Sequence, residues 1–169
     1  QGHRLSLFRT IAEAASRLDV QLVIAHCGGL SEREAGSLPA HFVARDLPQR
    51  AVLARAQACI THGGLNTTLD ALEFGVPLLA IPIAFDQPGV AARIEHSGAG
   101  LKLPRVLLTR RAVRSSLKRL LTEETFALRA RALGREIATA GGADRAAELI
   151  EAFVPGLPSI EPPLAEAAE

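Results

Sequence analysis

The sequence is poor in the residues that nucleic-acid-binding proteins use. Only six of its 169 residues are aromatic, all of them phenylalanine, so few rings are available for stacking on bases. The 19 basic and 18 acidic residues leave a formal net charge of +1, too balanced to attract a phosphate backbone. We therefore expect no nucleic-acid partner.

The sequence also has few cysteines and no long apolar run. Cys27 and Cys59 lie 32 residues apart, each beside an apolar segment, which favours buried reduced thiols over a disulfide or half of a metal site. The longest apolar stretch, around residues 76–85, is too short and too broken by proline to span a membrane. No signal peptide is visible, and the sequence predicts a cytoplasmic protein.

Several motifs of common enzyme classes are missing. There is no GxGxxG after a strand, no Walker lysine and no nucleophile elbow, which argues against dehydrogenases, kinases and hydrolases. There is no DxD pair of the kind that holds a divalent metal on a sugar nucleotide, and the histidines show no metal-ligand spacing. We expect no metal site.

The strongest positive feature is residues 60–70, an apolar strand that ends in His62, turns through two glycines and continues as a helix. Gly63 and Gly64 allow backbone angles closed to other residues and let a ligand approach the main chain. Free N–H groups and the positive end of a helix dipole converge at such a turn, which favours a bound phosphate. Side-chain oxygens that could cap the helix come from Asn66, Thr67 and Thr68.

A second strand follows this helix. Gly75 is typical of a helix end, and the apolar run 78–82 predicts a buried strand. Asp86 and Gln87 come just after it, at the edge of a parallel sheet where ligands bind.

The rest of the chain continues the alternation of strands and helices, which predicts a single α/β domain with a Rossmann-like parallel sheet and flanking helices over residues 1–154. No strand precedes the first helix, so we expect the first strand of the domain to be missing. Residues 31–39 are polar and predict a loop, and the proline-rich residues 155–169 predict a disordered tail. The other predicted strands cover residues 22–25, 41–44, 58–61 and 101–103, and the other predicted helices residues 5–18, 48–56, 88–97, 110–121, 122–140 and 143–153.

Four segments together resemble the donor-binding signature of UDP-sugar glycosyltransferases, in the C-terminal half of a GT-B fold. They are Asp46-Leu-Pro-Gln49, Thr61-His-Gly-Gly-Leu-Asn-Thr67, Gly75-Val-Pro77 and Asp86-Gln87. The sequences of residues 25–30 and 82–94 are similar to those of bacterial zeaxanthin glucosyltransferases. Asp46 and Leu65 depart from the family pattern, which often has aromatic residues at these two positions.

The resemblance implies a binding site for a UDP-sugar, the donor substrate, and no further cofactor. It places Gln49 at the uracil end, Asp70 at the ribose hydroxyls, and Asp86 and Gln87 at the transferred sugar. At the diphosphate it places His62, with the glycine turn and the helix start behind it: Gly63, Gly64, Asn66 and Thr67. The catalytic base of such enzymes is a histidine of an N-terminal acceptor domain, so no catalytic residue is expected in this chain.

The expected function is therefore the donor-binding half of an inverting, metal-independent glycosyltransferase. It would move glucose from UDP-glucose to a hydroxyl of a lipophilic acceptor such as zeaxanthin, and this chain alone would be inactive. A donor subunit of a naturally split transferase, a non-catalytic nucleotide-sugar-binding module and a sugar-nucleotide epimerase stay open as alternatives. The basic segment 105–119 is interpreted either as a solvated helix face or as a peripheral contact with anionic lipid at the inner face of the membrane.

Overall fold

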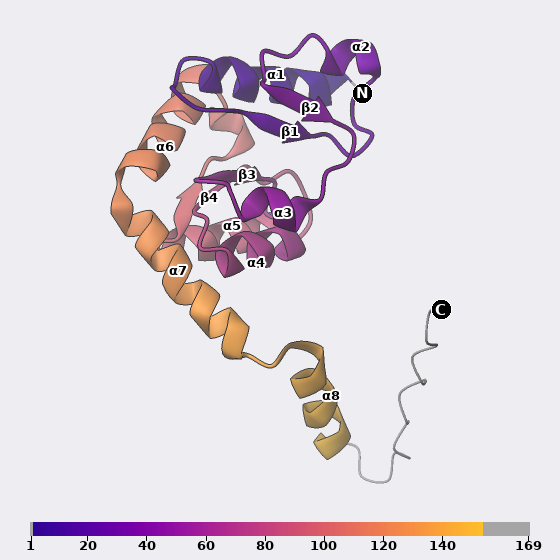
Figure 1. The fold of residues 1–169 in the computed structure, drawn as a ribbon, viewed down its shortest axis with the longest axis vertical. Helices are drawn as coiled ribbons and strands as arrows, with labels where there is room; N and C mark the ends of the chain where they lie inside the picture. Colours follow the sequence, from indigo (N-terminus) through magenta and orange to yellow (C-terminus); the bar gives the residue numbers. More distant parts are fainter. Residues whose placement is uncertain (1, 154–169) are drawn as a thin grey trace.

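The computed structural model describes residues 2–153, in which helices alternate with short parallel strands (Figure 1). The predicted tail, residues 155–169, lies outside the described residues. In chain order the elements are α1 (Gly2–Ala15), β1 (Val23–Ala25), α2 (Glu32–Ala35), β2 (Phe42–Ala44), α3 (Gln49–Leu53), β3 (Cys59–Thr61), α4 (Leu65–Glu73), β4 (Leu78–Ala80), α5 (Gln87–His96), β5 (Gly100–Lys102), the 3-10 helix η1 (Arg105–Leu107), α6 (Arg110–Thr122), α7 (Glu124–Thr139) and α8 (Gly142–Phe153).

The strands are all parallel, but they form two sheets. β1 pairs with β2, and β3, β4 and β5 form the second sheet in that spatial order. Among residues 2–153 no strand is hydrogen-bonded between β1 and β3, so each of these two keeps one edge without a strand partner. The predicted α/β class with parallel strands and flanking helices is confirmed, and the strands are divided between two sheets at this point.

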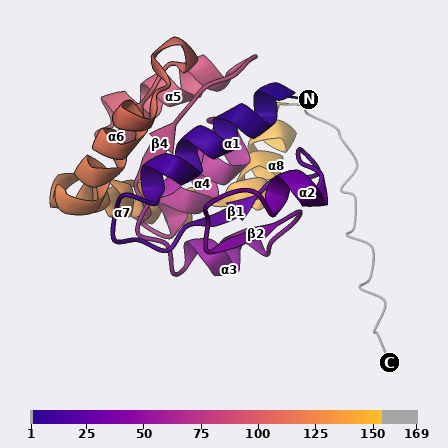
Figure 2. The ribbon, with the colours of Figure 1, turned by 90° about the horizontal axis from the view of Figure 1, so that it is seen from above.

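β4 lies at the centre of the fold, because its residues are buried on both faces. Leu78 and Ala80 pack into a cluster with α4, α5 and α7, and Leu79 packs on the other side with α1 and α6. α1 also contributes Ala12 to a third cluster that contains Ile24 of β1, so this helix covers parts of both sheets (Figure 2). The packing holds the carboxyl ends of β3 and β4, after which the predicted site residues follow.

The loop predicted over residues 31–39 is wrong in its first part, where α2 forms one helical turn. The Ser31 side chain accepts a hydrogen bond from the backbone N–H of Glu34, and the Glu34 carboxylate accepts one from the backbone N–H of Ser31 at 2.8 Å. This reciprocal capping satisfies two N–H groups at once, which stabilises a helix start even in a polar segment.

The two cysteines are free thiols in different surroundings. Cys27 is exposed, which contradicts its predicted burial, because it lies in the turn after β1 with a φ of 48°. Cys59 in β3 is partly buried, and this burial raises the pKa of its thiol to about 11.

The C-terminal helices begin within two residues of their predicted starts. The Thr109 side chain caps α6 by accepting a hydrogen bond from Ala112 N at 3.1 Å. α7 packs against α4, while α8 lies at the far end of α7, away from the sheets (Figure 1). None of the α8 side chains is buried. Within residues 2–153 no helix combines the length and the hydropathy needed to cross a membrane.

Candidate functional site

The turn between β3 and α4 depends on Gly63. Its φ is +87°, in the left-handed region that favours glycine, and its N–H donates to the buried Thr61 hydroxyl at 3.2 Å. A Cβ built at Gly63 would lie 3.2 Å from the Gln87 carbonyl oxygen. The turn therefore passes close to the start of α5, which brings two of the predicted site segments together.

The first turn of α4 is open, and the predicted side-chain caps are wrong. The N-cap residue is Gly64, which has no side chain, so no side-chain hydrogen bond caps this helix. The predicted capping hydroxyls lie inside the helix instead: Thr68 donates to the Gly64 carbonyl at 2.9 Å, and Thr67 donates to Gln49 Oε1 at 3.2 Å. The backbone N–H groups of the first turn are thereby left available to an anion.

His62 lies over this open helix end. A Cβ built at Gly64 would come within 2.7 Å of the His62 Nε2 atom, so the missing side chain of Gly64 makes room for the imidazole. The His62 side chain is exposed and makes no hydrogen bond to any of the described residues, and the same holds for Asn66 on the first turn. Both side chains are free to bind a ligand.

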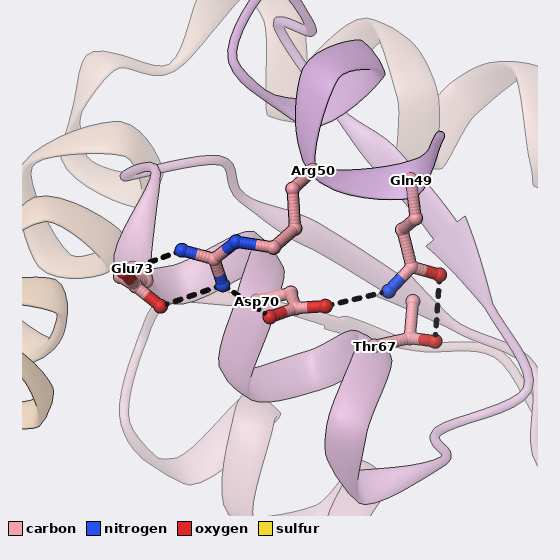
Figure 3. Close-up of polar contacts among 5 residues, drawn as sticks. All are labelled: Gln49, Arg50, Thr67, Asp70 and Glu73. Atoms are coloured by element: carbon pink, nitrogen blue, oxygen red, sulfur yellow. Dashed lines mark hydrogen bonds and ion pairs between the residues drawn. The ribbon is translucent and has the colours of Figure 1, made fainter. Parts of the chain in front are cut away.

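A second group of polar side chains joins α3 to α4 (Figure 3). Gln49 Nε2 donates to Asp70 Oδ2 at 2.7 Å, while Gln49 Oε1 accepts from Thr67. The sequence predicted all three as site residues, and the structure links them by hydrogen bonds. Thr67 and Asp70 lie along α4 from the glycine turn, so this helix carries the predicted phosphate site at its start and the predicted ribose site one turn later.

Arg50 and Glu73 were missed by the sequence prediction. Arg50 donates to Asp70 Oδ1 at 2.6 Å and forms two hydrogen bonds with the Glu73 carboxylate, at 2.7 and 2.9 Å. These contacts raise the pKa of Arg50, with the Glu73 hydrogen bond as the larger cause, and the same hydrogen bond lowers the pKa of Glu73. A signal was present: two carboxylates three residues apart share a helix face and repel unless a cation lies between them.

The predicted sugar-binding pair lies at the start of α5. Gln87 Oε1 accepts hydrogen bonds from the backbone N–H groups of Ile83 and Ala84, both at 2.9 Å. The side-chain amide oxygen of Gln87 thus holds the loop after β4, and the side-chain NH₂ group is left for a ligand. Asp86 is exposed and makes no hydrogen bond to a described side chain. The adjacent Phe85 has a φ of +56° and is 94% exposed.

Comparison with known proteins shows the family of the chain and several of its relatives. Residues 9–152 match the family described as erythromycin biosynthesis protein CIII-like, C-terminal domain. The chain is 44% identical over 154 residues to the zeaxanthin glucosyltransferase of Pantoea ananas, covering 89% of this chain and 36% of the relative. It is 41% identical over 163 residues to that of Pseudescherichia vulneris, covering 95% and 39%.

Solved glycosyltransferase structures share the fold. The kitacinnamycin glycosyltransferase superimposes with a TM-score of 0.78 at 32% identity, over 89% of this chain and 39% of that one. The glycosyltransferase VinC in complex with dTDP superimposes with a TM-score of 0.75 at 26% identity, over 88% and 39%. The chain thus spans well under half the length of the proteins that it matches. It belongs to the erythromycin biosynthesis protein CIII-like C-terminal domain family, the C-terminal domain of GT-B glycosyltransferases.

Proposed function

We propose that this chain is the donor-binding part of an inverting, metal-independent glycosyltransferase that transfers glucose from UDP-glucose to a hydroxyl of a lipophilic acceptor such as zeaxanthin. The observation that carries the proposal is the open N-terminus of α4 beneath the exposed His62, with the hydrogen bonds from Gln49 of α3 to Thr67 and Asp70 of the same helix. The zeaxanthin glucosyltransferases among the relatives support the acceptor class.

Each part of the donor would meet one part of this site. The diphosphate would lie at the N–H groups of the first turn of α4 and at His62, and the ribose would lie at Asp70. Asp86 and the free NH₂ group of Gln87 would face the sugar hydroxyls, which need both acceptors and donors. The preference for glucose rests on the resemblance of the Asp86-Gln87 pair to the family signature.

The residues of this chain would act on the leaving group. The acceptor oxygen attacks the anomeric carbon, the bond from that carbon to the diphosphate oxygen breaks, and the acceptor proton passes to a base outside this chain. Negative charge then grows on the diphosphate, where the helix terminus and His62 already lie, so they stabilise the transition state more than the bound donor.

We also propose that an N-terminal acceptor domain completes the enzyme, and that this chain binds the donor without turnover. The coverage of only 36–39% of the relatives supports this, as do the exposed apolar side chains of Leu149, Ile150 and Phe153 on α8. The unpaired edges of β1 and β3 support a further parallel strand between them.

A peripheral contact with anionic lipid at the inner face of the membrane is the proposed route to an acceptor as apolar as a carotenoid. Val106 is 91% and Leu107 59% exposed, and they stand beside the basic start of α6. A hollow between α1 and α6 is lined by Arg17, Arg110, Arg111 and Arg114, and by Glu13, which forms an ion pair with Arg110. Basic residues next to exposed aliphatic ones suit an anionic lipid surface.

Donor binding is tested by thermal unfolding of the chain with UDP and with UDP-glucose, with magnesium or with a chelator. We expect each ligand to raise the melting temperature as much in the chelator as in magnesium. Ligand at about 100 times its Kd adds about 2.7 kcal/mol of stability. A shift that needs magnesium would refute metal independence, and no shift at millimolar ligand would refute the proposed function. Sedimentation with neutral and anionic vesicles, at low and moderate salt, tests the lipid contact separately.

A further inference from the structure

Arg50 is held more firmly than its exposure suggests. Its guanidinium forms two hydrogen bonds with Glu73 and one with Asp70 (Figure 3). It also lies over the Phe74 ring, 5.0 Å from the ring centroid. An exposed ion pair with a single contact gains little, because two long side chains lose rotational freedom. Here the two hydrogen bonds to the Glu73 carboxylate and the contact with the Phe74 ring already restrict the Arg50 side chain. Its hydrogen bond to Asp70 therefore costs little additional rotational freedom.

The consequence falls on Asp70. Arg50 occupies one acceptor position on Oδ1, and Gln49 occupies one on Oδ2. An ionised carboxylate offers about four acceptor positions, so one remains on each oxygen. The Asp70 side chain is 25% exposed, which leaves these two positions within reach of a ligand. Two neighbouring acceptors at a fixed angle complement two neighbouring hydroxyls.

We propose that Arg50, held by Glu73, is a positioning residue that orients the Asp70 carboxylate toward the vicinal diol of a ribose, so that the site selects a ribonucleotide over its 2′-deoxy counterpart. This inference rests on the proposed function, because it takes the ribose to lie at Asp70. It concerns a real choice within the fold, since VinC was solved with a deoxyribonucleotide. Arg50 itself does not touch the ligand.

A purely structural role for Arg50 would be a clamp between α3 and α4. Loss of a clamp would lower stability and weaken every nucleotide to the same extent. Loss of an oriented acceptor would weaken only the ligand that carries the 2′-hydroxyl. The ratio of the Kd for 2′-deoxy-UDP to the Kd for UDP therefore separates the two roles.

The chain contains a matched control. Arg119 forms two hydrogen bonds with Glu123, at 2.8 and 3.1 Å, and lies 5.5 Å from the centroid of the Phe126 ring. Its side chain is 50% exposed, against 52% for Arg50. It joins the end of α6 to the start of α7, away from the predicted site residues. Arg119→Gln thus removes the same kind of contact without touching Asp70.

The experiment is calorimetric titration of the full chain, wild type and variants, with UDP and with 2′-deoxy-UDP. We expect the wild type to bind UDP about tenfold more tightly, the typical effect of one hydrogen bond to a charged group. Arg50→Gln should bring the ratio close to one by weakening UDP alone. Arg50→Lys should do the same, because lysine keeps the charge but lacks the fork, whereas Arg119→Gln should leave the ratio at its wild-type value.

Three outcomes would overturn the inference. Equal weakening of both nucleotides by Arg50→Gln would make Arg50 a clamp. A wild-type ratio in Arg50→Lys would make Arg50 a source of charge only. A wild type that binds neither nucleotide would instead refute the proposed function, and this inference with it. If Arg50→Gln does not fold, Glu73→Gln tests the same point, since it loosens Arg50 and should lower the ratio.

Discussion

Two histidine–glycine turns in this chain have similar sequences and different structures. His26 follows β1 and leads through Gly28 and Gly29 to α2, while His62 follows β3 and leads through Gly63 and Gly64 to α4. In the first turn His26 Nδ1 accepts a hydrogen bond from Leu30 N at 3.2 Å, and Ser31 and Glu34 cap the four-residue helix. In the second turn the histidine is exposed and the nine-residue helix has no side-chain cap.

The difference decides which of the two turns leaves its backbone donors open. The first turn satisfies its own donors with its own side chains, so it offers little to a ligand. The second leaves its donors open because glycine occupies the capping position, and its longer helix directs a larger dipole at the opening. Single substitutions test this difference, and they follow in order of decreasing expected effect.

The largest effect is expected from alanine at the positive-φ glycines. Gly63→Ala should destabilise the chain by about 2 kcal/mol and abolish UDP binding, since the new Cβ meets the Gln87 carbonyl and the turn must shift. Gly28→Ala, at φ +72° with only the Arg45 side chain nearby, should cost about 1 kcal/mol and leave UDP affinity unchanged. Denaturant unfolding and calorimetry measure the two quantities. Equal loss of UDP binding in both variants would remove the distinction between the turns.

The next effect is expected from the histidines. His62→Ala should weaken UDP and UDP-glucose by the same factor, about tenfold, because it acts on the diphosphate that they share, and should leave stability unchanged. His26→Ala should do the reverse, lowering the free energy of unfolding by about 1 kcal/mol through the lost bond to Leu30 without changing either Kd. Unequal loss of the two ligands in His62→Ala would move that residue away from the diphosphate.

A smaller effect is expected at the sugar. Asp86→Ala should remove any gain in affinity of UDP-glucose over UDP while UDP itself binds as before, since Asp86 would contact only the hexose. The change should not affect stability, because the side chain is exposed and makes no hydrogen bond within the described chain. Calorimetry with both ligands tests this. An equal loss for UDP would place Asp86 at the nucleotide.

The smallest effect is a pH dependence of stability that comes from the turn after His26. The backbone N–H and the hydroxyl of Ser31 lower the pKa of Glu34 below its ordinary value of 4.5. A lowered folded-state pKa adds stability above the ordinary value, and this stability is lost as the pH falls through the folded-state pKa. Glu34→Gln should therefore be less stable than the wild type at about pH 6, and the difference should shrink as the pH falls below 4.5. A constant difference over this range would contradict the assignment.

Much of this arrangement could be predicted from the sequence. The alternation of apolar runs with helical stripes predicted the parallel strands, and the Thr109 cap of α6 was correct. The family resemblance named Gln49, Thr67 and Asp70 as site residues, but it did not predict the hydrogen bonds that join them. The errors were local: α2 was missed because its stabilisation comes from one pair of reciprocal hydrogen bonds, and Cys27 was expected to be buried because an apolar strand precedes it.

The sequence by itself determined the class of fold, the glycine turn after β3 and the family, because these depend on periodicity and on residues close together in the chain. Only the tertiary structure decided which of the two turns stays open, and that Arg50 of α3 lies between two carboxylates of α4, 20 and 23 residues further on. Such contacts depend on how separate elements pack. Hydrophobic clusters on both faces of β4 set that packing, and no local pattern encodes it.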